Sequence, residues 1–235
     1  MKFNSPLIPG TLLRRHKRFL AEVKLKSGET IWAHCPNSGS MKGVNIPGNA
    51  VLVSHHPSDK RVLQYTWEMI SIDGGWVGIN TMIPNRIAAE AFESGLIPAF
   101  RRYGEYRSEV KISQDSRIDF VLGKRGHCMV EVKNVTLVEN GVARFPDCVS
   151  TRAAKHVRHL IENVRDGNTS AVLFVIQHHA AECFSPADDL DPEFGIILRK
   201  AVHSGVRIEA WKAEVSPEGI ALRERVKVKL CVPKG

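Results

Sequence analysis

Short apolar runs alternate with turn residues through the first third of the chain. Turn signals stand at 27–29 (SGE), 47–49 (PGN) and 73–75 (DGG), and such clusters of Gly, Pro, Asn and Asp separate strands. This spacing predicts a small β-barrel over residues 1–82. The OB-fold is the commonest nucleic-acid-binding barrel, although an SH3-like barrel would give a similar pattern. The expected strands are 19–26, 30–35, 50–55, 62–70 and 76–79.

After residue 82 the pattern changes to helices alternating with strands. Pro84 and Gly95 delimit a helix over 84–94, a second helix is predicted over 151–165, and 171–177 is an apolar run typical of a buried strand. Between the two helices, three strands are expected at 106–112, 117–122 and 127–133, the third extending through 135–138. This order matches the αβββαβ core of the PD-(D/E)xK nuclease superfamily. We therefore predict an α/β protein with an OB-like barrel and a nuclease-like domain over 83–235, completed by a helix at 191–204 and strands at 206–213 and 220–230.

Two strands of this core are expected to pair as a hairpin. If the chain turns at 124–126, with Gly126 free to take positive φ, Phe120 lies opposite Val130. Since side chains alternate along a strand, one face is then apolar and the other is charged. The apolar pairs would be Ile118/Val132, Phe120/Val130 and Leu122/Cys128, and the other face would pair Asp119/Glu131, Arg117/Lys133 and Val121/Met129.

The facing carboxylates of Asp119 and Glu131 are candidate metal ligands. Such a pair repels by up to roughly 1 kcal/mol unless a cation lies between the two groups. Hard oxygen ligands suit Mg²⁺ or Mn²⁺, which would activate a water, and Lys133 would orient that water or stabilise the developing anion. Glu90, on the first predicted helix, is a candidate further ligand. Two alternatives stay open: solvated carboxylates neutralised by Arg117 and Lys133, and a solvated helical Glu90.

The charge balance of the chain is basic. It carries 33 Lys and Arg against 25 Asp and Glu, a formal net charge of +8, which favours a polyanionic partner, nucleic acid before anionic lipid. The alternative is a basic protein that binds no polyanion. Residues that would contact DNA phosphates in the barrel, making affinity strongly salt-dependent, are Arg14, Arg15, Lys17, Arg18, Lys60 and Arg61.

The second predicted helix adds a cationic stripe. Arg152, Lys155, His156 and His159 recur at helical spacing on one side, where they could track a phosphate backbone or form an ordinary solvated face. Aromatic residues are candidates for stacking on unpaired bases, although tryptophans on barrel strands more often belong to the core. These are Trp32, Trp67 and Trp76.

The cysteines and the apolar runs bear on the compartment. Five cysteines occur without any CxxC pair, which favours neither a disulfide framework nor a thiolate zinc site and fits a reducing cytoplasm. No apolar stretch approaches the length of a membrane span. We expect a cytoplasmic protein without a membrane partner.

Seven stretches of the chain match one known family in order: 17–20 (KRFL), 34–41 (HCPNSGSM), 80–81 (NT), 85–86 (NR), 116–120 (SRIDF), 130–137 (VEVKNVTL) and 145–147 (FPD). Together they resemble the sugar fermentation stimulation protein family of bacteria and archaea, and the similarity covers nearly the whole chain. The resemblance implies an OB-like domain joined to a PD-(D/E)xK-like domain, DNA binding without sequence preference, and a proposed regulatory role in sugar, particularly maltose, metabolism. One departure is Ala153, where glycine is expected: its methyl group lies where backbone would approach a phosphate.

Overall fold

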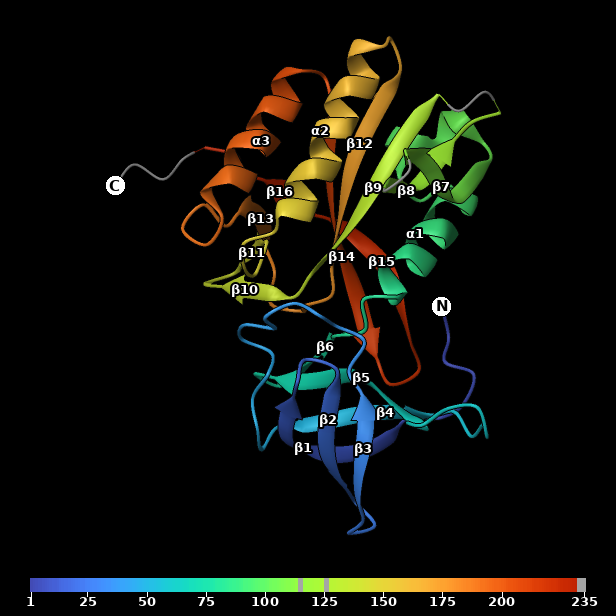
Figure 1. Ribbon diagram of the computed structural model, residues 1–235, viewed down its shortest axis with the longest axis vertical. Helices are drawn as coiled ribbons and strands as arrows, with labels where there is room; N and C mark the ends of the chain where they lie inside the picture. Colours follow the sequence, from blue (N-terminus) through green and yellow to red (C-terminus); the bar gives the residue numbers. More distant parts are fainter. Residues whose placement is uncertain (114–115, 125–126, 232–235) are drawn as a thin grey trace.

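The N-terminal strands close into a barrel. The structure is a computed structural model that describes residues 1–113, 116–124 and 127–231. The sheet order is β3-β2-β1-β4-β5-β6, and a parallel pairing of β3 with β5 closes it, which confirms the OB-like barrel (Figure 1). Buried Leu12, Val23, Val51 and Trp67 fill its interior. The strands are β1 (Ile8–His16), β2 (Leu20–Leu25), β3 (Thr30–His34), β4 (Ala50–His55), β5 (Tyr65–Ile72) and β6 (Gly75–Gly78).

Strand β1 precedes the first strand that the sequence pattern predicts. Its side chains alternate only weakly in polarity, because Gly10 and Leu12 point inward while the strand ends in basic residues. A Cβ on Gly10 would lie 2.6 Å from Val23 Cγ1, so a glycine is needed where β1 and β2 approach closely. The basic run at 14–18 is therefore partly strand rather than a lead-in segment.

The C-terminal domain is a mixed sheet with helices on both faces, in the order β15-β14-β12-β9-β8-β7. Helix α1 packs on one face around Ile87 and Phe120, and α2 and α3 pack on the other around Leu160 and Phe194. The central pairs β9–β12 and β12–β14 are parallel. Its elements are α1 (Ile83–Glu93), the 3-10 helix η1 (Pro98–Tyr103), β7 (Tyr106–Ser113), β8 (Ser116–Leu122), β9 (Cys128–Val135), α2 (Thr151–Arg165), β12 (Thr169–Ile176), α3 (Pro192–His203), β14 (Arg207–Ser216) and β15 (Gly219–Arg225).

A second, small sheet lies beside the main one, and the sequence pattern predicted only part of it. Its order is β10-β11-β13-β16. Strands β11 and β13 are too short to show a period and pair with each other across about forty residues, so only tertiary contact defines them. The strands are β10 (Leu137–Glu139), β11 (Val142–Phe145), β13 (Cys183–Pro186) and β16 (Lys227–Val228).

The hairpin of β8 and β9 has the predicted register at its outer end. Phe120 pairs with Val130 and Leu122 with Cys128, although the predicted turn at 124–126 lies partly outside the described residues. The pairing of Ile118 with Val132 is wrong, because these two side chains belong to core clusters on opposite faces of the sheet. The regular ladder ends at Phe120, and the two strands part where the acidic residues lie.

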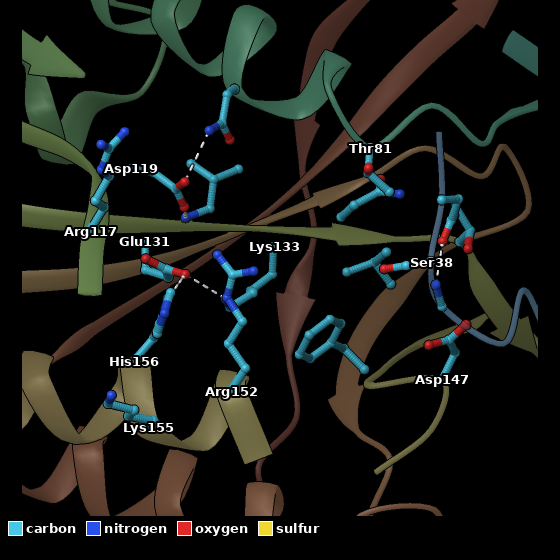
Figure 2. A pocket seen from close by; sticks show the side chains of 18 of the residues that line it. Ser38, Thr81, Arg117, Asp119, Glu131, Lys133, Asp147, Arg152, Lys155 and His156 are labelled. Carbon is cyan, nitrogen blue, oxygen red and sulfur yellow. Dashed lines mark hydrogen bonds and ion pairs between the residues drawn. The ribbon is translucent and has the colours of Figure 1, made fainter. Parts of the chain in front are cut away.

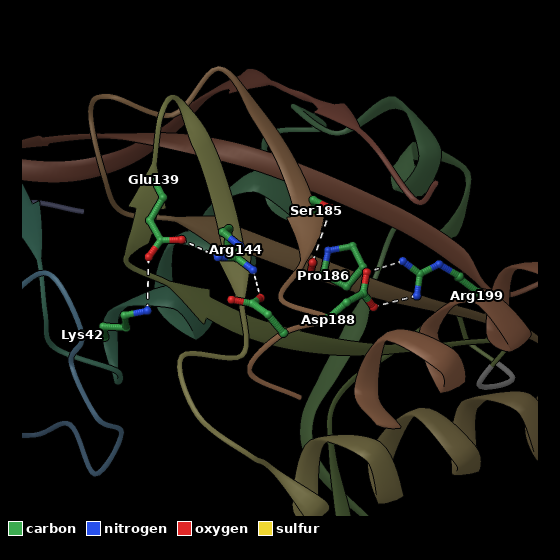
Figure 3. Close-up of polar contacts among 8 residues, drawn as sticks. Lys42, Glu139, Arg144, Ser185, Pro186, Asp188 and Arg199 are labelled. Carbon is green, nitrogen blue, oxygen red and sulfur yellow. Dashed lines mark hydrogen bonds and ion pairs between the residues drawn. The ribbon is translucent and has the colours of Figure 1, made fainter. Parts of the chain in front are cut away.

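The barrel is held directly against the sheet domain through β6. Val77 forms a bridge with His178, and the Gly78 N–H donates to the Gln177 carbonyl at 3.0 Å. A Cβ on Gly78 would lie 2.4 Å from Gln177 Oε1, so the junction requires bare backbone there. Lys42, in the segment between β3 and β4, also forms an ion pair with Glu139 of β10 at 3.2 Å (Figure 3). In the described residues, no helix is both long and apolar enough to cross a membrane.

Candidate active site between the two domains

A cavity of about 1120 Å³ lies between the barrel and the sheet domain. Side chains from both domains line it, and Figure 2 shows the acidic pair and the α2 residues on one side with Ser38, Thr81 and Asp147 on the other. Most of the lining is polar. The polar and charged lining residues include Asn37, Ser38, Thr81, Asn85, Glu109, Lys111, Arg117, Asp119, Glu131, Lys133, Asn134, Arg144, Asp147, Arg152, Lys155 and His156.

Asp119 is oriented by two hydrogen bonds. Its Oδ2 accepts from the Val132 N–H at 2.7 Å, and its Oδ1 accepts from Asn85 Nδ2 of α1 at 3.0 Å. Burial, followed by the nearby charge of Glu131, raises the pKa of Asp119 to about 6. A cation close to this carboxylate would stabilise its ionised form and so lower its pKa.

Glu131 is more deeply buried, with 2% of its surface exposed. Its Oε1 accepts from Lys133 Nζ at 2.5 Å and also contacts Nδ1 of His156 on α2. Burial opposes ionisation, but the hydrogen bond from His156 and the charge of Lys133 outweigh it, so the pKa of Glu131 is lowered. Its other oxygen, Oε2, is buried and accepts no hydrogen bond from the described residues. The surroundings of Glu131 therefore favour its ionised form, and one of its two oxygens is not engaged by those residues.

The structure thus brings Asp119, Glu131 and Lys133 together, as the sequence predicts. His156 is a correction: it does not join a solvated stripe, because it is buried and directed at Glu131. The helical spacing places it one residue before the apolar Val157, at the edge of the buried face, and that position was the available signal. Arg152 and Lys155 are exposed and line the cavity.

The basic residues of the barrel are not in the cavity lining. Arg14 bonds Glu22 at 2.6 Å and lies over the Trp32 ring, and Arg15 donates to backbone carbonyls, including that of Asn37 at 2.6 Å. Trp67 is core, whereas Trp32 keeps 38% of its surface exposed. The remaining predicted DNA contacts in the barrel are surface-exposed: Lys17, Arg18, Lys60 and Arg61.

Glu90 is not brought to the acidic pair. Its carboxylate accepts from the Met1 amino group at 2.6 Å, and it does not line the cavity. Across 1–113, 116–124 and 127–231, no group of three or more His, Cys, Asp and Glu side chains is arranged to hold a metal ion. Two carboxylates fit a hydrated cation whose remaining ligands are waters and phosphate oxygens, which is how Mg²⁺ is commonly bound.

The barrel contributes a wall that sequence reasoning did not assign to the site. The barrel loop, residues 37–40, begins three residues after the end of β3 and lines the cavity through Asn37, Ser38 and Gly39. Asp147 holds it from the other domain, accepting from Ser40 Oγ at 2.9 Å and from the Met41 N–H at 2.7 Å. A run of small polar residues shortly after β3 was the available local signal.

Sequence comparison matches both parts of the chain. Residues 13–79 match the family described as the SfsA N-terminal OB domain, and residues 82–219 match the sugar fermentation stimulation protein RE domain. The chain is 50% identical over 230 residues to a sugar fermentation stimulation protein homolog of Geobacter metallireducens, covering 97% of this chain and 99% of that protein. It is 51% identical over 224 residues to a homolog of Pelobacter propionicus, covering 95% and 97%.

One solved structure is similar over almost the whole chain. It is described as the structure of Pyrococcus furiosus SfsA in complex with Ca²⁺. The TM-score is 0.87 at 28% sequence identity, covering 97% of this chain and 98% of that one. Both domains and their arrangement are therefore those of a known fold.

Proposed function

The chain belongs to the sugar fermentation stimulation protein family, and we propose that it binds DNA without sequence preference and hydrolyses phosphodiester bonds with a Mg²⁺ or Mn²⁺ ion. The ion would be held by Asp119 and Glu131. The observation that carries the proposal is the unpartnered Oε2 of Glu131, a buried oxygen on an ionised carboxylate beside Asp119. A buried polar atom without a partner is rare and calls for one.

The DNA-binding part of the proposal rests on charge. The net charge is +8, and exposed basic residues lie both on the barrel and at the cavity, where Lys111, Arg117, Arg152 and Lys155 line it. Lysine and arginine contacts to phosphates carry no sequence information. Binding through them would be non-specific and would weaken steeply with salt.

The residues around the acidic pair have distinct parts in the proposed reaction. When bound, the cation supplies an activated water and stabilises charge on the phosphate. Asn85 and the Val132 N–H fix Asp119, while His156 fixes Glu131 from α2. Lys133, on the same strand as Glu131, is placed to donate to a phosphate oxygen or to the water. Arg152 and Lys155 would position the phosphate from α2.

A second candidate is DNA binding without cleavage, in a regulatory role in sugar metabolism such as the names of the relatives suggest for those proteins. Two observations favour it. The described residues hold no third acidic ligand, and Lys133 and His156 already occupy one oxygen of Glu131. A neutralised acidic pair can be retained as part of a scaffold after activity is lost.

Cleavage and binding assays separate the two candidates. Purified protein is incubated with single-stranded and duplex DNA in Mg²⁺ or Mn²⁺, alongside Asp119→Asn and the matched variant Glu90→Gln, whose carboxylate lies outside the cavity. We expect cleavage by the wild type and Glu90→Gln only. Absence of cleavage by the wild type, or equal cleavage by Asp119→Asn, refutes the nuclease proposal. DNA affinity that does not fall with added salt refutes phosphate-led binding.

A further inference from the structure

We propose that the cavity accepts an unpaired DNA strand and excludes the duplex, with the barrel loop as the excluding wall. This substrate class rests on the proposed function, because it concerns the strand that reaches Asp119 and Glu131. The inference comes from the size of the cavity, the fixed position of its wall, and the distribution of charge inside it.

The cavity is too small for double-stranded DNA. A cube of 1120 Å³ has an edge of about 10 Å, which is less than the roughly 12 Å width of the major groove of B-DNA alone. The volume is close to that of pockets that enclose one drug-sized ligand, about 300–1,000 Å³. A few nucleotides of a single strand fit this space, whereas a duplex cannot be enclosed by it and would lie across its opening.

The wall that limits the cavity is anchored from both domains. Arg15 of β1 donates to the carbonyl oxygens of Asn37 at 2.6 Å, Gly39 at 3.0 Å and Ser40 at 3.3 Å. From the sheet domain, the Asp147 carboxylate accepts from Ser40 Oγ and the Met41 N–H. Hydrogen bonds to charged groups are the stronger ones, and here both anchors are charged. The loop is therefore a fixed boundary rather than a flap.

The wall also has close packing that resists displacement. A Cβ on Gly39 would lie 3.1 Å from Asp147 Oδ2 and 3.1 Å from Asn37 Oδ1. Asn37 itself is buried and donates through Nδ2 to the Ile79 carbonyl at 3.1 Å, and Thr81 donates to the Pro36 carbonyl at 2.6 Å. Opening the wall for a duplex would break these contacts together.

The cavity has a charged half and a half in which neutral polar groups predominate. Lys155 and Arg152 lie beside the acidic pair, whereas Ser38 and Thr81 line the side toward the barrel (Figure 2). Asp147 also lies on that side, with its carboxylate bonded to the barrel loop. Arg144 also lines the cavity but is paired with Glu139 and Asp189 (Figure 3), so it adds little positive potential. A phosphate would bind in the charged half, and the hydroxyl and amide groups of the other half suit the edges of an unpaired base.

Binding measurements test this assignment without relying on cleavage. The probes are hexathymidine and a hairpin duplex closed by a non-nucleotide linker, so that it has no unpaired bases, added separately to metal-free wild-type protein, Ser38→Trp and Ser27→Trp. Ser38 is exposed on the wall, so tryptophan there is expected to fill the cavity, and Ser27, exposed in the turn after β2, is the matched control. We expect Ser38→Trp to weaken hexathymidine binding at least about tenfold, which corresponds to about 1.4 kcal/mol. Affinity for the hairpin should not change in either variant.

Cleavage rates give a second arm. In Mn²⁺, a single strand should be cut at least about tenfold faster than the duplex of the same sequence, because a duplex must first unpair to enter. Hexathymidine affinity unaffected by Ser38→Trp would mean that single strands bind only the outside of the barrel and would overturn the inference. Equal cleavage of both forms would also overturn it while leaving the nuclease proposal standing. If the wild type cleaves neither form, the nuclease proposal alone is refuted. The binding measurements would still show whether the cavity accepts an unpaired strand.

Discussion

The basic residues of the barrel and those at the cavity differ in the groups that surround their charged side chains. In β1, Arg14 pairs with Glu22 on the surface, and Arg15 turns inward to bond the carbonyls of the barrel loop. On α2, Arg152 and Lys155 face a space that contains two buried carboxylates. All four residues satisfy the same sequence criterion for phosphate contact. The acceptors within reach, rather than the charge itself, separate loop anchoring from substrate binding.

The largest effect on activity should come from changing the acidic pair, Asp119 and Glu131, because these two residues would hold the cation. Glu131→Gln removes the ionised oxygen that would hold the cation, so cleavage should fall by more than about 100-fold, beyond the usual effect of residues that only orient metal ligands. Mn²⁺ binding measured by calorimetry should be lost together with activity. Unchanged Mn²⁺ affinity in a variant that remains folded by circular dichroism would contradict this prediction.

Replacing basic side chains at the cavity and replacing basic side chains on the barrel should have different consequences. Arg152→Gln or Lys155→Gln should lower the cleavage rate by about 10- to 100-fold, because they act where charge develops on the phosphate. Lys17→Gln or Lys60→Gln should instead lower DNA affinity. Each should also reduce the slope of log affinity against log salt concentration by about the value of one phosphate contact. Rate measurements at saturating DNA, together with salt titrations, distinguish the two effects. Equal kinetic effects from both groups would remove the distinction between barrel and cavity.

The two adjacent arginines offer the sharpest comparison of stability. Arg15→Lys loses a planar fork that bonds several carbonyls, so the free energy of unfolding should fall by about 1–3 kcal/mol. Arg14→Lys alters a surface ion pair and should change it by less than about 1 kcal/mol. Urea denaturation measures both under identical conditions. A larger loss for Arg14→Lys would contradict the anchoring role of Arg15.

A smaller, pH-dependent effect is expected at the junction of the two regions. Burial lowers the pKa of His178 to about 4, and the neighbouring His179 acts in the same direction. Its Nδ1 accepts from the Ala180 N–H at 3.2 Å, which requires the neutral ring. The unfolded chain takes up the proton near the ordinary value of 6.5 and the folded chain only near 4, so stability should fall as pH falls through this window, by at most about 1.4 kcal/mol per pH unit.

Thermal unfolding between pH 7 and pH 4 tests the histidine, with His178→Gln expected to flatten the slope. His55, exposed at the end of β4, provides the matched variant His55→Gln, which should keep the wild-type pH dependence. A wild-type slope in His178→Gln would show that other groups govern the acid sensitivity.

Local sequence determined much of the fold and the centre of the site. Helical spacing located α2, which has one continuous apolar face. Pro84 and Gly95 delimited nearly all of α1. The alternation along β8 and β9 set the outer register, with Phe120 opposite Val130, and hence brought Asp119 near Glu131 and Lys133. These features follow from the side-chain period of a single element and one turn, which neighbouring residues specify.

Tertiary structure alone decided the surroundings of that centre. Asp147 and Ser40, which are 107 positions apart in the sequence, form a hydrogen bond. Glu90 binds the Met1 amino group instead of joining the acidic pair. His156 is directed inward because Glu131 lies beside it. The parting of β8 and β9 that separates Ile118 from Val132 likewise depends on a side chain replacing the regular ladder. The partner of each of these side chains is the group nearest to it in the folded protein. A local sequence pattern cannot predict that partner, because the distance between remote segments is set only by folding.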